Sequence, residues 1–381
     1  MKNMTLEVPR WMMRLLVAST TAMVVIGWFG LRSLGIKADW LAFYAAGSFT
    51  LQGELSQIYD AAVIQAWEEP LIGANIIRFL YAPAYATTFV PLAFMPVQAA
   101  RYSWLVVGVL ASLLASRLST RWSGLSTPLS ALALLAFPPL AYSLAVGQIS
   151  PITLLIFSFV ASQEWQEKHG YLPGMVAGLA LFKPQLLLPI IFYWLFQRRW
   201  RSLIGFMFTA SLFSLVSWLI SPQATLAYIQ LSTQFMPLAE NATTTGANAS
   251  FYSVHPWLGI LVSAGIIATL FFTSGRGNNR YKQALLWIAP VLVTPYIVIY
   301  DMLLLALPIS FLLLLLSRDR LMQATVGLIW FTPLFAIAIH TTHPVTWSAF
   351  VLFIVCAWRF FKTPAGQISH SNEFIEHPAS S

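Results

Sequence analysis

The chain has 381 residues, of which 58% are hydrophobic and only 9% are charged, and its formal net charge is +8 at pH 7. A soluble domain carries about 25% charged residues, so this composition excludes a protein whose whole surface faces water and predicts an integral membrane protein. The excess of Lys and Arg is typical of the cytoplasmic loops of such a protein, and we do not expect nucleic acid as a partner.

Apolar runs along the chain predict membrane-spanning helices, each of which needs about 20 mostly apolar residues. The first run, Leu15–Leu34, is too long for a signal-peptide core and is followed by no A-x-A-like site, so we expect it to be retained as a helix. The fold class predicted is an all-α polytopic membrane protein with about 12 transmembrane helices, in one domain over residues 1–362. The other candidate spans are Tyr85–Met95, Tyr102–Leu118, Leu125–Val146, Ile149–Ala161, Leu172–Phe196, Leu203–Ile220, Trp257–Phe272, Ala284–Val298, Met302–Leu316, Leu321–Ile339 and Val345–Phe361.

Basic residues predict the orientation of these spans. The N-terminal Lys2, Arg10 and Arg14 place the start of the chain in the cytoplasm. On this path the Arg198–Arg201 cluster also falls on the cytoplasmic side. Arg117 and Arg121 fall on the outer side, against the positive-inside rule.

Two polar stretches, residues 35–83 and 221–256, are predicted on the outer side. The first holds five acidic and two basic residues, and its Leu41–Thr50 segment has helical spacing, so we expect interfacial helices there. The cytoplasmic loops are short and leave no room for a cytosolic catalytic domain. The tail, residues 363–381, is predicted to be disordered and cytoplasmic.

Three ionisable residues stand at the ends of apolar runs or inside them, where a charge is costly and often functional. Asp39 precedes Trp40 at the outer end of the first helix and suits a general base, with a helix N-cap as the alternative. Lys183 precedes a helix-breaking proline inside an apolar run. It can bind a phosphate or pair with a carboxylate, and the alternative is snorkelling to the interface. Asp301 lies where two predicted helices meet and is either functional or an N-cap.

Further candidates lie at the starts of predicted outer helices. Arg78 and Tyr81 precede the second span, and Arg78 can bind an anionic headgroup. His255 precedes a proline at another helix start, a position where a lone histidine is more often structural. Gly147 and Gln148 form a polar turn or contact a lipid phosphate. No nucleotide-binding or serine-hydrolase motif is present, so ATP-driven transport and serine hydrolysis lose support.

Five segments, taken in order, resemble glycosyltransferase family 87, which includes the mycobacterial polyprenol-phosphate-mannose-dependent mannosyltransferases. The resemblance runs from about Asp39 to Pro308. The segments are Asp39–Gly47 with Tyr59-Asp60, Tyr81–Tyr85 with Pro91 and Pro96, Gly147–Pro151, Phe182–Gln185, and Thr294–Tyr296 with Tyr300-Asp301.

The resemblance implies a GT-C architecture in the inner (plasma) membrane, with an extracytoplasmic active site. It implies transfer of a mannose-like hexose from a polyprenyl-phosphate donor to a lipid or glycan acceptor, with inversion and with Asp39 as base. The residues expected to bind the donor phosphate or sugar are Arg78, Tyr81, Lys183, Gln185, His255, Tyr300 and Asp301. No cofactor is expected, although a divalent metal is compatible with this chemistry.

The alternative hypothesis is a transporter or flippase of lipid-linked sugars that does no covalent chemistry. It shares the lipid-facing site and the embedded charges. The large outer loop, the lack of a visible internal repeat and the position of Asp39 favour the enzyme.

Overall fold

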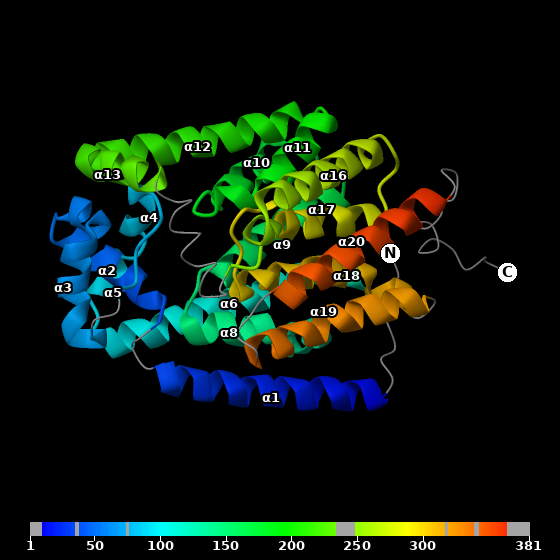
Figure 1. The fold of residues 1–381 in the computed structure, drawn as a ribbon, viewed down its shortest axis with the longest axis horizontal. Helices are drawn as coiled ribbons and strands as arrows, with labels where there is room; N and C mark the ends of the chain where they lie inside the picture. The colour runs from blue at the N-terminus through cyan, green and yellow to red at the C-terminus, as the bar shows by residue number, and fades with distance from the viewer. Residues whose placement is uncertain are drawn as a thin grey trace.

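The computed structural model describes residues 10–34, 38–73, 76–233, 248–316, 319–338 and 343–363. Within these ranges the chain forms helices and no strand, which confirms the all-α prediction (Figure 1). Part of the second polar stretch (residues 234–247) and the tail beyond residue 363 lie outside the described residues.

Five helices in the described ranges are long and apolar enough to cross a membrane. The pair α7 (Thr127–Leu135) and α8 (Pro138–Val146), bent by 69° at a short break, makes a sixth if it counts as one span. The chain is therefore a multi-pass membrane protein, but the predicted number of about 12 spans is not confirmed. The five helices are α6 (Val97–Ser123), α12 (Trp200–Ile220), α16 (Pro256–Ser274), the continuous η3 (Ile299–Leu305) and α18 (Ala306–Leu316), and α20 (His343–Lys362).

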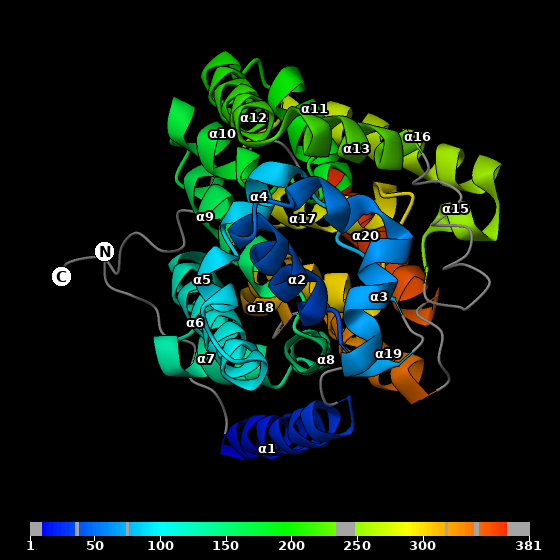
Figure 2. The same ribbon diagram turned by 90° about the vertical axis from the view of Figure 1, so that its left-hand side faces the viewer.

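The predicted span Tyr85–Met95 is not one helix. Two short helices, α4 (Pro83–Thr87) and α5 (Val90–Ala93), replace it, and each has a proline in its first turn, where the missing N–H is tolerated. They gather with α2 (Trp40–Leu51), η1 (Leu55–Tyr59) and α3 (Ala61–Ile72) at one end of the molecule, which faces the viewer in Figure 2. The first polar stretch thus forms short helices, and their place at the membrane interface stays a prediction.

The predicted span Leu172–Phe196 is a broken hairpin. It consists of α10 (Tyr171–Gly178), the 3-10 turn η2 (Pro184–Leu186) and α11 (Leu188–Phe196). Ser202 at the start of α12 donates to the carbonyl of Gly170 at 3.0 Å, so the chain returns to the end from which it came. Lys183 lies at the turning point, just before the proline that cannot continue the helix hydrogen bonding.

These two differences correct the placement of Arg117 and Arg121. Arg121 of α6 contacts Ser162 of α9 (Ser150–Trp165), and Arg199 pairs with Glu164 near the end of the same helix. The predicted path has one membrane crossing too many at Tyr85–Met95 and one too few at Leu172–Phe196, where the chain goes in and comes back. With both corrected, Arg121 and Arg199 lie at the same end of the bundle. We call this the basic end of the bundle.

The centre of the bundle is α17 (Arg280–Val293), which Figure 1 shows between α9, α16 and α20. Every residue from Lys282 to Val293 is buried, as expected of a helix that is surrounded by other helices. It runs from the basic end and leads the chain into the irregular segment before η3. The remaining elements are α1 (Arg10–Leu34), which packs along α8, and α13 (Pro222–Thr233), α15 (Phe251–Val254) and α19 (Arg320–Ala338).

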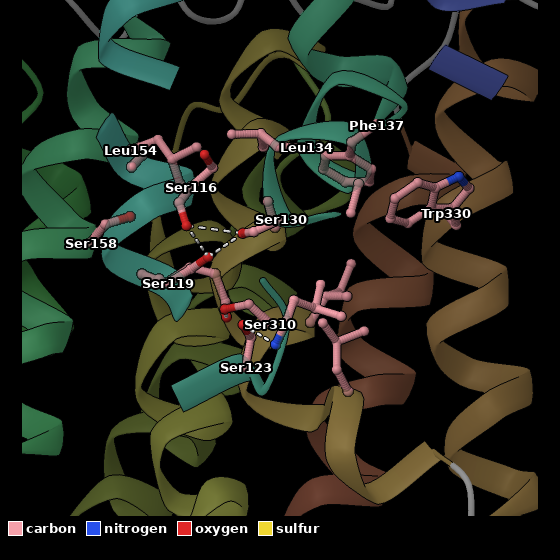
Figure 3. Close-up of a pocket in the computed structure, with 17 residues that line it drawn as sticks. Ser116, Ser119, Ser123, Ser130, Leu134, Phe137, Leu154, Ser158, Ser310 and Trp330 are labelled. Atoms are coloured by element: carbon pink, nitrogen blue, oxygen red, sulfur yellow. Dashed lines mark hydrogen bonds between the residues drawn. The ribbon is translucent and has the colours of Figure 1, made fainter. Parts of the chain in front are cut away.

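A small cavity of about 60 Å³ lies among α6, α7, α9, α18 and α19 (Figure 3). Ser116, Ser119 and Ser130 point toward one another there: the hydroxyls of Ser119 and Ser130 lie 2.6 Å apart, and Ser130 donates to the carbonyl of Ser116 at 2.9 Å. Small polar residues that bond to one another in this way hold membrane helices together. We interpret this cluster as structural.

Candidate functional site

A cavity of about 750 Å³ opens at the end of the bundle formed by the short helices. Its walls come from segments far apart in the sequence. It brings together seven of the eight predicted site residues, namely Asp39, Arg78, Tyr81, Lys183, Gln185, Tyr300 and Asp301.

Asp39 directs its carboxylate into this cavity. It precedes α2 but caps no backbone N–H with its side chain, which argues against the N-cap alternative. Its Oδ2 instead accepts a hydrogen bond from Gln148 Nε2 at 2.6 Å. Burial raises the pKa of Asp39 above its ordinary value of 3.8, and the Gln148 hydrogen bond and the charge of Lys183 oppose this only in part. A carboxylate with raised proton affinity suits a general base.

The Gly147 turn positions Gln148. Gly147 ends α8 with φ of +70°, a left-handed conformation that favours glycine. A Cβ at this position would lie 2.5 Å from the Cβ of Trp40, and Trp104 Nε1 donates to the Gly147 carbonyl at 2.7 Å. The tight contact with Trp40 holds Gln148 against Asp39.

We expect Gly147→Ala to destabilise the protein by about 1–3 kcal/mol, because the new side chain adds backbone strain and a contact with Trp40. Transfer activity should fall with it, since Gln148 would lose its position. Thermal unfolding in detergent measures the first effect. Gly265→Ala is the matched control, because its Cβ would meet no atom within 4 Å; equal stability of the two variants would contradict this account.

Lys183 and Asp301 form an ion pair, with side chains only 9% and 5% exposed. Ser150 Oγ donates to Asp301 Oδ1 at 3.0 Å, and the Lys183 ammonium lies 4.8 Å from the centre of the Tyr300 ring. Of the alternatives considered for Lys183, the structure thus shows the pairing with a carboxylate. The side chain does not extend to the membrane interface. The partners come from the broken hairpin and from η3, so the pair holds these two segments together at the cavity wall.

Arg78 is the exposed cation of the cavity. It forms no hydrogen bond or ion pair with any residue that the structure describes. Its segment is fixed on both sides: Glu68 Oε2 accepts from the N–H of Ile77 at 2.7 Å, and the Tyr59 hydroxyl donates to the carbonyl of Tyr81 at 2.7 Å. The guanidinium is thus placed at the cavity while remaining available to an anion.

Sequence reasoning missed several residues at this site. Tyr142 lines the cavity but lies inside an apolar run and carries no local signal. Ser150, whose hydroxyl bonds to Asp301, belongs to the Gly147–Pro151 segment of the family resemblance, but no role was predicted for it. Tyr296 belongs to the Thr294–Tyr296 segment of the family resemblance, but no role was predicted for it. Burial raises the pKa of Tyr296 to about 12, so its phenol keeps its proton and can donate a hydrogen bond.

Asn248 is a further residue without a sequence signal, and it supports the wall from outside the cavity. Its Oδ1 accepts from the N–H of Ile297 at 3.2 Å and from that of Ser250 at 3.1 Å. Ser250 Oγ donates to the carbonyl of Pro295 at 2.7 Å. These bonds hold the irregular segment that carries Tyr296.

His255 does not join the other predicted residues. It is exposed and precedes α16, where its Nδ1 accepts from the N–H of Trp257 at 3.3 Å, and it is absent from the cavity wall. Over the described residues, no group of three His, Cys, Asp or Glu side chains lies close enough to hold a metal ion.

Comparison with known proteins finds a family match that covers part of the cavity wall. Residues 79–300, which include Tyr81, Lys183, Gln185 and Tyr300, match the model of glycosyltransferase family 87. An alpha-(1->3)-arabinofuranosyltransferase of Corynebacterium glutamicum is 27% identical over 229 residues, or 54% of this chain and 52% of that protein. The match thus spans about half the length of this curated relative. No solved structure matches the chain.

Proposed function

The chain belongs to glycosyltransferase family 87, and from this premise we propose that it transfers a sugar from a polyprenyl-phosphate donor to a lipid or glycan acceptor. One observation carries the proposal: the half-buried carboxylate of Asp39 and a cation, Arg78, that has no partner among the described residues line the same cavity of about 750 Å³. The carboxylate provides a base for the acceptor, and the cation provides a site for the donor phosphate.

In the proposed reaction, Asp39 takes the proton of an acceptor hydroxyl while that oxygen attacks the anomeric carbon of the donor sugar. The bond between this carbon and the phosphate oxygen breaks, and polyprenyl phosphate leaves with the electron pair. The configuration at the sugar inverts because attack and departure occur on opposite faces. The raised pKa of Asp39 favours its role as proton acceptor.

The departing phosphate develops negative charge, which positive or hydrogen-bond-donating groups stabilise. Arg78 is our first candidate because it is free of partners among the described residues, and Tyr81 lines the cavity beside it. Lys183 already pairs with Asp301. We therefore assign to this pair the positioning of the cavity wall, with Tyr300, Asp301 and Gln185 available to sugar hydroxyls.

Two donor sugars remain open. A mannose-like hexose follows from the family resemblance of the sequence, whereas the name of the relative from Corynebacterium glutamicum points to an arabinofuranose. Labelled polyprenyl-phosphate donors of both kinds, supplied separately, decide between them.

The distribution of basic residues supports an extracytoplasmic cavity in the inner membrane. Arg121, Arg199 and Arg280 lie at the basic end, where Arg280 stacks on Trp165 at 5.3 Å from the ring centre. The cavity lies at the other end of α9, next to Ser150. Under the positive-inside rule the basic end faces the cytoplasm, so the donor enters from the outer leaflet.

Purified protein in liposomes separates transfer from flipping. Loss of labelled sugar from the donor lipid and its appearance in an acceptor supports the transferase. A change in the sidedness of an intact donor, with no product, would support the flippase instead.

We expect Arg78→Ala to raise the KM for the donor about 10–100-fold, the effect of losing one charge-assisted hydrogen bond to phosphate. Stability should hardly change because the side chain is exposed. Arg78→Lys keeps the charge and should recover part of the loss. An unchanged KM in Arg78→Ala, measured with a labelled donor series, would remove Arg78 from the phosphate site.

A further inference from the structure

A second pocket, of about 410 Å³, lies on the other side of α2 from the catalytic cavity. Two different faces of α2 line the catalytic cavity and this second pocket. Ala42 and Phe43 follow Asp39 on the cavity side, whereas Tyr44, Ser48 and Leu51 face the second pocket at the spacing of one helix face. The pocket is completed by Gln52, by Trp67, Pro70 and Leu71 of α3, by Ala93 and by Val97.

The walls of this pocket are uncharged and aromatic. None of its lining residues is an acid, lysine, arginine or histidine. The ring centres of Tyr44 and Trp67 lie 6.2 Å apart, and both side chains are half-buried. Such a pocket gives no counter-charge to a phosphate or carboxylate, but it presents flat apolar faces to a neutral ligand.

Hydrogen-bond donors remain open in the same pocket. The Trp67 indole N–H and the Gln52 side-chain amide make no hydrogen bond with any residue that the structure describes. A ligand that offers both apolar ring faces and hydroxyl groups would use both features. A neutral sugar ring has this combination.

The aromatic walls are held rigidly before any ligand arrives. The Tyr44 hydroxyl donates to the carbonyl of Met95 at 3.0 Å, and the Tyr44 ring also packs on Trp40 with centres 5.8 Å apart. Trp67 packs against the buried Phe49 with ring centres 6.0 Å apart. A pre-ordered site loses little conformational entropy on binding.

Exposed apolar side chains lie next to the pocket: Leu51 is part of its wall, and Phe94, which is 72% exposed, follows Ala93. In a membrane protein such residues contact lipid. The pocket therefore adjoins apolar surface that suits contact with lipid, from which a membrane-anchored glycan can reach it.

We propose that this pocket binds a neutral sugar of the acceptor glycan. The proposal rests on the proposed function and extends it, because it locates the acceptor. With a rise of about 1.5 Å per residue, the residues of α2 that face the pocket lie about 7 to 18 Å beyond Asp39 along the helix. The bound sugar is thus remote from the hydroxyl that reacts, and the pocket selects acceptors that already carry a glycan.

The test measures binding of octyl glycosides that carry a dimannoside or a di-arabinofuranoside to the full chain in nanodiscs, by saturation-transfer NMR. It uses the Asp39→Asn background without donor, so that its result does not depend on transfer. Trp67→Ala is expected to weaken binding of the preferred glycoside about tenfold, the loss of one aromatic contact. Trp67→Phe should recover part of it.

Gln52→Ala tests the pocket independently, because this exposed residue can be replaced without disturbing the core. Trp257→Ala, which removes an exposed indole from α16, is the matched control and should bind like the parent. Parent-like binding in both Trp67→Ala and Gln52→Ala would overturn the proposal, as would the absence of binding in the parent. Weakened binding in these variants while Asp39→Asn retains full transfer would uphold the pocket and refute the base.

Discussion

Asp39→Asn is expected to lower the rate of sugar transfer about 10²–10⁴-fold, the range for loss of a general base. Asparagine has nearly the same shape and still offers an oxygen to Gln148, whose Nε2 lies 2.6 Å from Asp39 Oδ2. The fold and donor binding should therefore remain. Membranes that contain the protein, labelled polyprenyl-phosphate sugars and host lipid extract provide the assay, with expression of the two forms matched.

The pH dependence makes this prediction specific to the carboxylate. The base is active when deprotonated, so the rate of the native enzyme should rise with pH through the pKa of Asp39. Burial raises that pKa, and the rise should lie above the ordinary value of 3.8. Because the Gln148 hydrogen bond lowers the pKa, Gln148→Leu should move the rise to higher pH.

The residual activity of Asp39→Asn should lack this dependence. Equal product from the native protein and from Asp39→Asn would show that Asp39 is not the base. Asp301 would then be the next residue to test. A pH profile in Gln148→Leu identical to that of the native enzyme would show that the titration belongs to another group.

The sequence is sufficient to find three charged residues of the cavity, because a charge at the end of an apolar run or inside it is rare and costly. Asp39, Lys183 and Asp301 stand out for this reason, and the structure brings them to one cavity. The evidence for His255 in the sequence is weaker, because it consists only of the place before Pro256, and the structure explains that place by the capping of α16.

The path of the chain was harder to predict. Hydropathy measures the length of an apolar run but does not distinguish a membrane span from a hairpin broken by proline. It therefore predicts one span over Leu172–Phe196, where the chain turns back at Lys183. For the same reason hydropathy predicts a span over Tyr85–Met95, where the structure has the two short helices α4 and α5. The uncharged pocket escaped prediction because Tyr44 and Trp67 come from two helices and each alone resembles an ordinary interfacial aromatic residue.

The Lys183–Asp301 pair is expected to show strong coupling in a double-mutant cycle. Lys183→Met alone should cost about 3–5 kcal/mol of stability, because it leaves a buried carboxylate without its counter-charge. Asp301→Asn alone leaves a buried ammonium and should cost a similar amount. The combined variant should regain most of this loss, since no uncompensated charge remains.

Thermal unfolding in nanodiscs measures the three variants, and transfer assays follow on those that fold. Arg359→Met provides the matched control at the basic end, because Arg359 is 32% exposed in its pair with Asp319 and should show a smaller effect. Additive effects of Lys183→Met and Asp301→Asn would mean that the two charges do not depend on each other. A stable double variant with full transfer activity would make the pair purely structural, whereas a stable but inactive one would support its role in positioning Tyr300 and the sugar.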